Sequence, residues 1–98
     1  MIIVILRAEL QPGADRDVEQ MLSPALALAA ATKGFIASTR YAAGEEQLLL
    51  LEFESHEALA SWRDHPDNSA TQGAGRDHLF RRLHIQVCDL VRAYEIAS

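Results

Sequence analysis

Apolar residues follow an alternating pattern at the start of the chain. All even positions of residues 1–10 are apolar, while the odd positions begin apolar and turn polar at Arg7 and Glu9. The stretch is also rich in β-branched residues, which favour strands. The pattern predicts a β-strand over residues 1–10 with at least one face in the core.

Gln11-Pro12-Gly13 is a turn signal. After it, apolar residues recur at intervals of three and four residues. The new spacing predicts an amphipathic helix that is capped by Asp15, ends at Gly34 and packs on a sheet. Pro24 lies inside the pattern and removes one backbone hydrogen bond, so we expect a kink or a short break there. The apolar positions that define this helix are Val18, Met21, Leu22, Ala25, Leu28 and Ala29.

Residues 35–41 and 47–54 are two further strand candidates. The short connection between them predicts an antiparallel hairpin. The four consecutive leucines at 48–51 show no alternation, which is typical of a strand covered on both faces. If helices cover only one face of the sheet, a partner subunit would have to cover the other.

The second half of the chain predicts one more helix and one more strand. Ser55 can cap a helix over residues 56–64, which His65-Pro66 then interrupts. Residues 67–82 are weakly helical, and residues 83–96 have the period of two of a closing strand. One face of that strand would carry Ile85, Val87 and Val91.

The order strand, helix, strand, strand, helix, strand predicts an α+β fold of the ferredoxin-like type. Such a fold has one antiparallel sheet with both helices on one face. The uncovered face would carry Ile3, Ile5 and part of the leucine run, a patch that a monomer rarely leaves in water. We therefore expect a homodimer whose sheets pack face to face, with polar groups paired near the contact. The polar groups we expect there are Arg7, Glu52 and Asp89.

Composition and charge narrow the possible functions. The 98 residues, 49% apolar and 23% charged, are expected to form one folded domain over residues 1–98. A net charge of -5 argues against a nucleic-acid partner, because phosphate binding needs a basic face. We recognise no signal peptide and no membrane span, and expect a soluble, cytoplasmic protein. Cys88 is the only cysteine and the histidines lack ligand spacing, so neither a disulfide nor a metal site is expected.

Three stretches of the chain resemble the antibiotic biosynthesis monooxygenase family. They are Gln11-Pro12-Gly13 after the first strand, Lys33-Gly34-Phe35 before the second, and residues 51–62 (LEFESHEALASW). His65-Pro66, and Gly75-Arg76 followed by residues 85–87 (IQV), extend the likeness into the second half. The resemblance implies a dimeric α/β barrel with a pocket between helices and sheet. In that pocket some members oxidise polycyclic or quinol substrates with O2, without metal, flavin or haem, so we expect no cofactor.

Another branch of that family binds and degrades haem. It uses an Asn on the first strand and a His about ten residues after the tryptophan, where this chain has Leu6 and Gln72. Axial ligation of haem iron needs a His, Cys, Met or Tyr. Haem degradation is therefore disfavoured.

Two residues are candidates for catalysis. His65 is either an exposed residue at the end of a helix or a base in the pocket, since histidine titrates near neutral pH. Arg76 is either a surface residue in an ion pair or the group that anchors a developing oxyanion. Quinol-oxidising family members often carry a His close to the position of Pro66, and this chain departs from that pattern.

Four further residues are candidate substrate contacts. Trp62 is either a core residue or a wall of the pocket. Asn68 and Gln72 lie one helical turn apart and either bind a substrate carbonyl or form a solvated helix surface. Tyr41 either donates to a phenolate or packs at the base of the hairpin.

These observations lead to a first hypothesis of a cofactor-independent monooxygenase. Its substrate would be a small aromatic, phenolic or quinol-type compound, oxidised with O2. The alternative is a non-catalytic dimeric barrel that binds a small molecule or a partner. An isomerase or lyase acting on a similar ligand is a third reading, because a fold does not determine a reaction.

Overall fold

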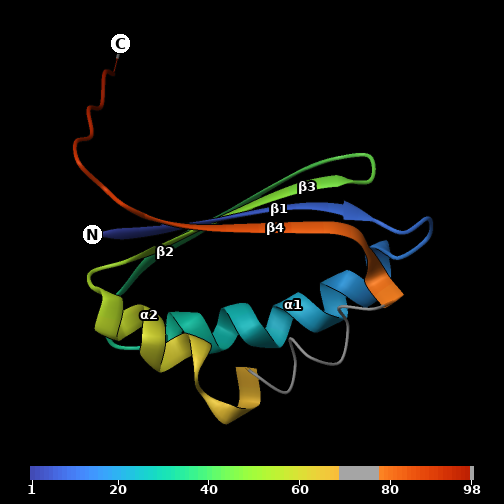
Figure 1. The fold of residues 1–98 in the computed structure, drawn as a ribbon, viewed down its shortest axis with the longest axis horizontal. Helices are drawn as coiled ribbons and strands as arrows, with labels where there is room; N and C mark the ends of the chain where they lie inside the picture. Colours follow the sequence, from blue (N-terminus) through green and yellow to red (C-terminus); the bar gives the residue numbers. More distant parts are fainter. Residues whose placement is uncertain (69–77, 98) are drawn as a thin grey trace.

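A computed structural model describes residues 1–68 and 78–97 of the chain. The elements follow the predicted order along the sequence (Figure 1). They are β1 (Ile2–Leu10), α1 (Asp15–Ala30), β2 (Phe35–Ala43), β3 (Glu46–Phe53), α2 (His56–Arg63) and β4 (Phe80–Asp89).

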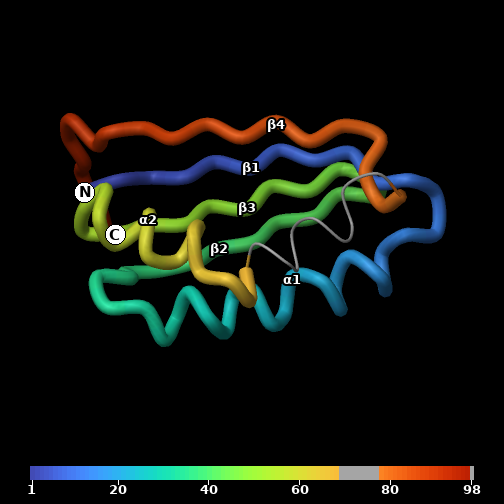
Figure 2. Tube along the Cα trace, turned by 60° about the horizontal axis from the view of Figure 1, so that its bottom comes forward, coloured from blue at the N-terminus to red at the C-terminus, as the bar shows by residue number. Residues whose placement is uncertain are grey.

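The four strands form one antiparallel sheet with the order β2-β3-β1-β4. Both helices lie on the same face of this sheet, and the other face is left uncovered (Figures 1 and 2). This arrangement confirms the predicted α+β, ferredoxin-like fold. We call the uncovered side of the sheet the open face.

Strand register decides which side chains meet the helices. Val4 lies opposite Leu51 on β3 and opposite Val87 on β4, so these three side chains share the helix-facing side. Val4 and Leu51 are 3% and 0% exposed, which places them in the core. The period of two predicted for β1 therefore holds, and β3 also buries one set of its leucines against the helices.

The first helix forms where expected, with two differences. Ala14 occupies the N-cap position without a side-chain hydrogen bond, whereas Asp15, the predicted cap, is the first helical residue. The helix also continues through Pro24 as one element, so the predicted break is absent. A proline inside a helix costs about 3 kcal/mol, and burial of Val18, Ala25 and Ala29 on the sheet supplies compensating packing.

The hairpin between β2 and β3 is tighter than the sequence pattern suggested. The strands extend to Ala43 and Glu46, which face each other across a two-residue turn. Gly44 enters that turn with a φ of 61°. Glycine is favoured there because other residues are strained at positive φ.

The second helix agrees with the prediction. The Ser55 hydroxyl accepts a hydrogen bond from the Ala58 N–H at 3.1 Å, as an N-cap should. Gly34 lies just beneath this helix with a φ of 90°, and a Cβ there would be 2.6 Å from the Ala58 Cβ. The glycine thus lets the loop after α1 approach α2 closely. Of the weakly helical stretch predicted over residues 67–82, residues 69–77 lie outside the described residues, and residues 80–82 belong to β4 instead of a helix.

The last strand differs from its prediction over residues 83–96. It begins earlier, at Phe80 opposite Leu10, and ends at Asp89. Beyond it, Val91 was expected on the same face as Val87, but its side chain is 96% exposed. The last printed hydrogen bond between this segment and the start of the chain is the one that Leu90 donates to the Met1 carbonyl at 3.0 Å.

Candidate functional site

A pocket of about 230 Å³ lies between the two helices and the helix-facing side of the sheet. Each neighbouring element contributes apolar side chains to its wall. Among them are Val4 and Leu6 from β1, Leu26 from α1, Trp62 from α2, and Ile85 and Val87 from β4. Such a wall favours an apolar or aromatic ligand.

The pocket exists because the described helices do not cover β4. Helix α1 packs on β2 and α2 on β3, while β4 is the strand at the opposite edge of the sheet. Ile85 and Val87 face the helix side but remain 46% and 52% exposed. These two side chains form the apolar floor of the pocket at that edge.

Trp62 is both a core residue and a wall of the pocket. Its side chain is 6% exposed, and its ring lies 5.7 Å from that of Phe53 between ring centres. The indole Nε1–H donates to the Ala25 carbonyl of α1 at 2.9 Å. This bond fixes the orientation of the ring and joins the two helices on either side of the pocket. The two interpretations left open by the sequence are therefore compatible.

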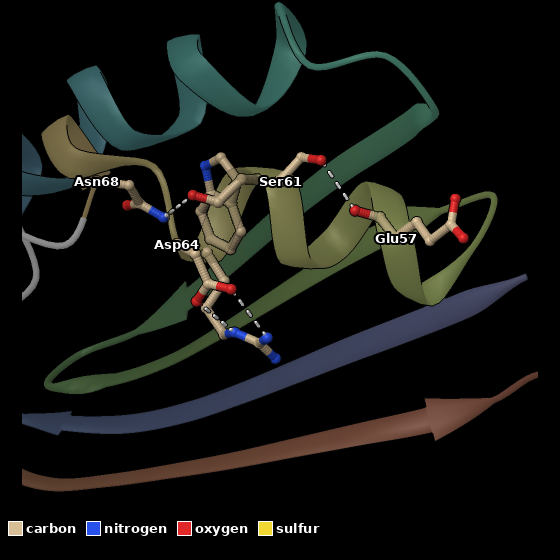
Figure 3. A network of polar contacts seen from close by, with 6 residues as sticks. Glu57, Ser61, Asp64 and Asn68 are labelled. Atoms are coloured by element: carbon tan, nitrogen blue, oxygen red, sulfur yellow. Dashed lines mark hydrogen bonds and ion pairs between the residues drawn. The ribbon is translucent and has the colours of Figure 1, made fainter.

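Asn68 is buried rather than solvated. It is 1% exposed, and its Nδ2 donates to the Trp62 carbonyl at 2.9 Å (Figure 3). The last carbonyls of a helix lack partners within the helix, so this amide satisfies one at the end of α2. The expectation of a solvated surface is wrong for Asn68, because the chain folds back under α2 after Pro66. The Asn68 amide therefore binds the C-terminal end of α2, the helix that carries Trp62.

His65 lies in the turn after α2 and is not among the residues that line the pocket. Its Nδ1 accepts a hydrogen bond from the Asp67 N–H at 3.2 Å, and the Asp67 carboxylate is 4.0 Å away. Its side chain is 42% exposed. The His65 side chain therefore does not line the described pocket wall, although its backbone N–H donates to the Trp62 carbonyl at 3.3 Å. Two other predicted site residues, Gln72 and Arg76, lie outside the described residues.

Tyr41 lies on the open face, on the other side of the sheet from the pocket. It pairs with Leu48, which in turn lies opposite Arg7, and its side chain is 60% exposed. Tyr41 and Arg7 line a wider hollow of about 510 Å³ near the hairpin, together with Arg82 and His84. Because this hollow faces away from the helices, Tyr41 and Trp62 do not belong to one site.

Arg63 is a pocket residue that the sequence did not single out. It lines the pocket beside Trp62, and its guanidinium pairs with the Asp64 carboxylate through two contacts of 3.1 and 3.3 Å (Figure 3). This hydrogen-bonded pairing lowers the pKa of Asp64 and raises the pKa of Arg63. The available signal was its place directly after Trp62, at the border of the apolar side of α2.

Comparison with known proteins identifies the fold and the family. The family model for antibiotic biosynthesis monooxygenase matches residues 1–74. The chain belongs to the antibiotic biosynthesis monooxygenase family. No curated protein matches the sequence closely enough to count as a relative.

Solved structures of similar fold extend this result. Rv0793 from Mycobacterium tuberculosis has a TM-score of 0.84 at 21% identity, over 96% of this chain and 98% of that one. SnoaB from Streptomyces nogalater, a cofactor-independent oxygenase, has a TM-score of 0.80 at 14% identity, over 94% of each chain. NE2512 from Nitrosomonas europaea, a protein of unknown function, has a TM-score of 0.76 at 21% identity, over 99% of this chain and 95% of that one. At these identities the likeness shows the fold.

The side chains that line the pocket can be compared with the haem ligands used by the haem-degrading branch of the antibiotic biosynthesis monooxygenase family. Leu6 lies on the pocket wall, and the lining formed by residues 1–68 and 78–97 contains no Cys, His or Tyr, while Met21 is its single methionine. This donor set does not fit the histidine ligation used by that branch. Within the same residues, no three His, Cys, Asp or Glu side chains gather in a way that could hold a metal ion. No helix of the described part is long and apolar enough to cross a membrane.

Proposed function

We propose that this protein is a cofactor-independent monooxygenase that oxidises a small aromatic, phenolic or quinol-type compound with O2. The observation that carries the proposal is the apolar pocket of about 230 Å³ whose wall includes the fixed indole of Trp62. An apolar cavity of about 150 Å³ in another protein holds benzene. A ligand of about two fused rings is therefore a reasonable match in size.

The substrate itself supplies the electrons in this chemistry. A phenolate or hydroquinone anion passes an electron to O2, and the pocket excludes the water that would compete for the reactive intermediates. In a monooxygenation of a ring CH2 next to such an anion, one oxygen atom becomes the new carbonyl and the other leaves as water with the two hydrogens. All four electrons that reduce O2 then come from the substrate, so no further reductant is needed.

The side chains divide into those that shape the pocket and those that would handle charge. Trp62 and the apolar residues of β1 and β4 would hold the rings. Arg63 is the charged group of the described wall and would attract a phenolate, although Asp64 already pairs with it. The roles predicted for Gln72 and Arg76 stand as made from the sequence. His65 would have to leave its hydrogen bond with the Asp67 N–H to act in the pocket.

The test is oxygen uptake by the metal-free protein with a panel of hydroquinones, naphthols and anthrone-type phenols, with product masses measured in parallel. We expect uptake above the autoxidation rate, and a product that has gained one oxygen or has become a quinone. Trp62→Ala should abolish this uptake, whereas Tyr41→Phe on the open face should retain it. Equal rates for wild type and Trp62→Ala would refute the role of the pocket.

A second candidate function is binding without turnover. It is supported by one observation, namely that the lining formed by the described residues offers no carboxylate or histidine to accept a proton. A panel compound that raises the melting temperature but causes no oxygen uptake would favour this reading. In either case we propose that the protein works as a cytoplasmic homodimer.

A further inference from the structure

Arg63 lies where the apolar pocket meets solvent. It belongs to the last turn of α2 and lines the pocket, yet its side chain is 56% exposed. All other lining residues in the described part of the chain are apolar. The chain has a net charge of -5, so its overall field does not attract anions. Recognition of an anionic ligand at this wall therefore needs a local cation, and among the described residues Arg63 supplies it.

The Arg63 guanidinium already holds a carboxylate, that of the next residue in the chain. The two oxygens of Asp64 accept from Nε at 3.1 Å and from Nη2 at 3.3 Å (Figure 3). Arginine binds carboxylates in general through two such parallel contacts. The pairing also lowers the pKa of Asp64, which is therefore an anion at neutral pH. Asp64 thus occupies the guanidinium in the way a carboxylate from a ligand would.

A ligand can replace Asp64 in this pair. The Asp64 side chain is 68% exposed, and an ion pair between exposed groups is weak because water solvates both partners. A ligand carboxylate that is attached to rings in the pocket meets the guanidinium where part of the water is already excluded. Its attraction to Arg63 is stronger for that reason. The ligand therefore has an advantage that Asp64, in solvent, lacks.

The chemistry of the guanidinium favours a carboxylate over a phenolate as the bound anion. Its planar fork donates to two acceptor oxygens at once, and a carboxylate offers two oxygens where a phenolate offers one. A carboxylic acid also ionises near pH 4, whereas an unperturbed phenol ionises only near about pH 10. The anion that meets Arg63 at neutral pH is then a group distinct from the phenol that would react with O2.

We propose that Arg63 selects ligands that carry a carboxylate beside their aromatic rings, and that Asp64 occupies the guanidinium until such a ligand replaces it. The inference rests on the proposed function and narrows its substrate to an aromatic acid with a separate phenol or quinol group. The rings of the bound ligand lie against Trp62 and the apolar residues of β4, and its carboxylate lies at the mouth of the pocket. Asp64 is a competitor of the ligand.

Isothermal titration calorimetry with 2-naphthoate and 2-naphthamide tests the selection. The two compounds share their fused rings and differ in charge, and neither has a phenol, so the result does not depend on the reaction with O2. We expect the wild type to bind naphthoate on the order of 10-fold more tightly, because hydrogen bonds to charged groups are the stronger ones. Arg63→Gln should remove this preference. Unchanged binding of naphthamide to Arg63→Gln would show that its pocket is intact.

The Asp64 variant shows whether that residue competes with the ligand. Asp64→Asn should bind naphthoate about 3-fold more tightly than wild type, the effect of losing a weak exposed ion pair, and naphthamide equally. The matched control Arg16→Gln, on the exposed side of α1 and outside the described pocket wall, should retain the wild-type preference. The proposal is overturned by no binding of either compound, by equal affinities in the wild type, or by weaker binding of naphthoate to Asp64→Asn. A preference that survives Arg63→Gln and disappears in Arg76→Gln would overturn it as well.

Discussion

Replacing Trp62 by Phe probes the side chain that links the core to the pocket. The change removes the Nε1–H that donates to the Ala25 carbonyl at 2.9 Å, while an aromatic ring remains beside Phe53. A net hydrogen bond contributes about 1 kcal/mol. The smaller ring also buries roughly 40 Å² less apolar surface, which is worth about 1 kcal/mol. We therefore expect the free energy of unfolding to fall by about 2 kcal/mol.

Urea denaturation of both proteins at one fixed concentration measures this loss, since assembly would make stability depend on concentration. For a domain of this size the same loss lowers the melting temperature by about 8–16 °C. Trp62→Ala removes the whole ring and should cost about 3–5 kcal/mol. If Trp62→Phe and wild type differ by less than about 0.5 kcal/mol in the free energy of unfolding, the bond to Ala25 does not stabilise the packing of α2 against α1.

Three further predictions concern the residues around α2. Gly34→Ala should lower the free energy of unfolding by more than about 2 kcal/mol, because the new Cβ would meet Ala58 at a strained positive φ. Asn68→Ala should cost about 1–3 kcal/mol, since it removes the shorter of the two hydrogen bonds to the Trp62 carbonyl and leaves only the bond of 3.3 Å from the His65 N–H. The pKa of Asp64 is lowered by Arg63, so the pair stabilises the fold above the ordinary pKa of an aspartate, about 4. That contribution is lost as the pH falls through the lowered pKa, and Asp64→Asn should differ from wild type at pH 7 but not at pH 2.

Gly34→Ala has a matched control, and each of the three predictions has an outcome that would contradict it. Gly13 also has a positive φ, of 77°, but a Cβ there would meet nothing within 4 Å, so Gly13→Ala isolates the backbone strain. Equal losses for Gly13→Ala and Gly34→Ala would show that the contact with Ala58 has no cost. Thermal melts of Asn68→Ala that match wild type would contradict the capping role. For Asp64→Asn, a difference that persists at pH 2 would point to a cause other than ionisation.

Much of the fold follows from local patterns in the sequence. The period of two in residues 1–10, the three-four spacing of α1 and the Ser55 cap of α2 each depend on near neighbours in the chain, and each appears in the structure. The element order then leaves few topologies, because short connections and right-handed crossovers exclude most alternatives. At Pro24 the helix continues without the short break that the pattern allowed, and after Asp89 the strand ends earlier than the pattern predicted. There, packing of a whole helix and the end of a neighbouring strand determine the outcome.

The candidate site was only partly predictable. Trp62 stood out from its place on an amphipathic helix, and the family resemblance implied the pocket that the structure contains. Ile85 and Val87 became pocket residues only through the position of β4 at the sheet edge, which no local pattern encodes, whereas Arg63 had a local signal in its place directly after Trp62. The separation of Tyr41 from Trp62 had the same origin, because strand register decides the face on which a side chain lies.

The sequence by itself determined the elements, their order and the apolar side of each, since these depend on propensity and periodicity within a few residues. Only the tertiary structure decided which of those residues meet. It buried Asn68 at the end of α2, turned His65 toward Asp67, and left Val91 and Ile96 exposed after β4. The physical reason is that contacts between residues distant in the chain depend on how helices and strands pack on one another, and that packing is decided by the whole molecule at once.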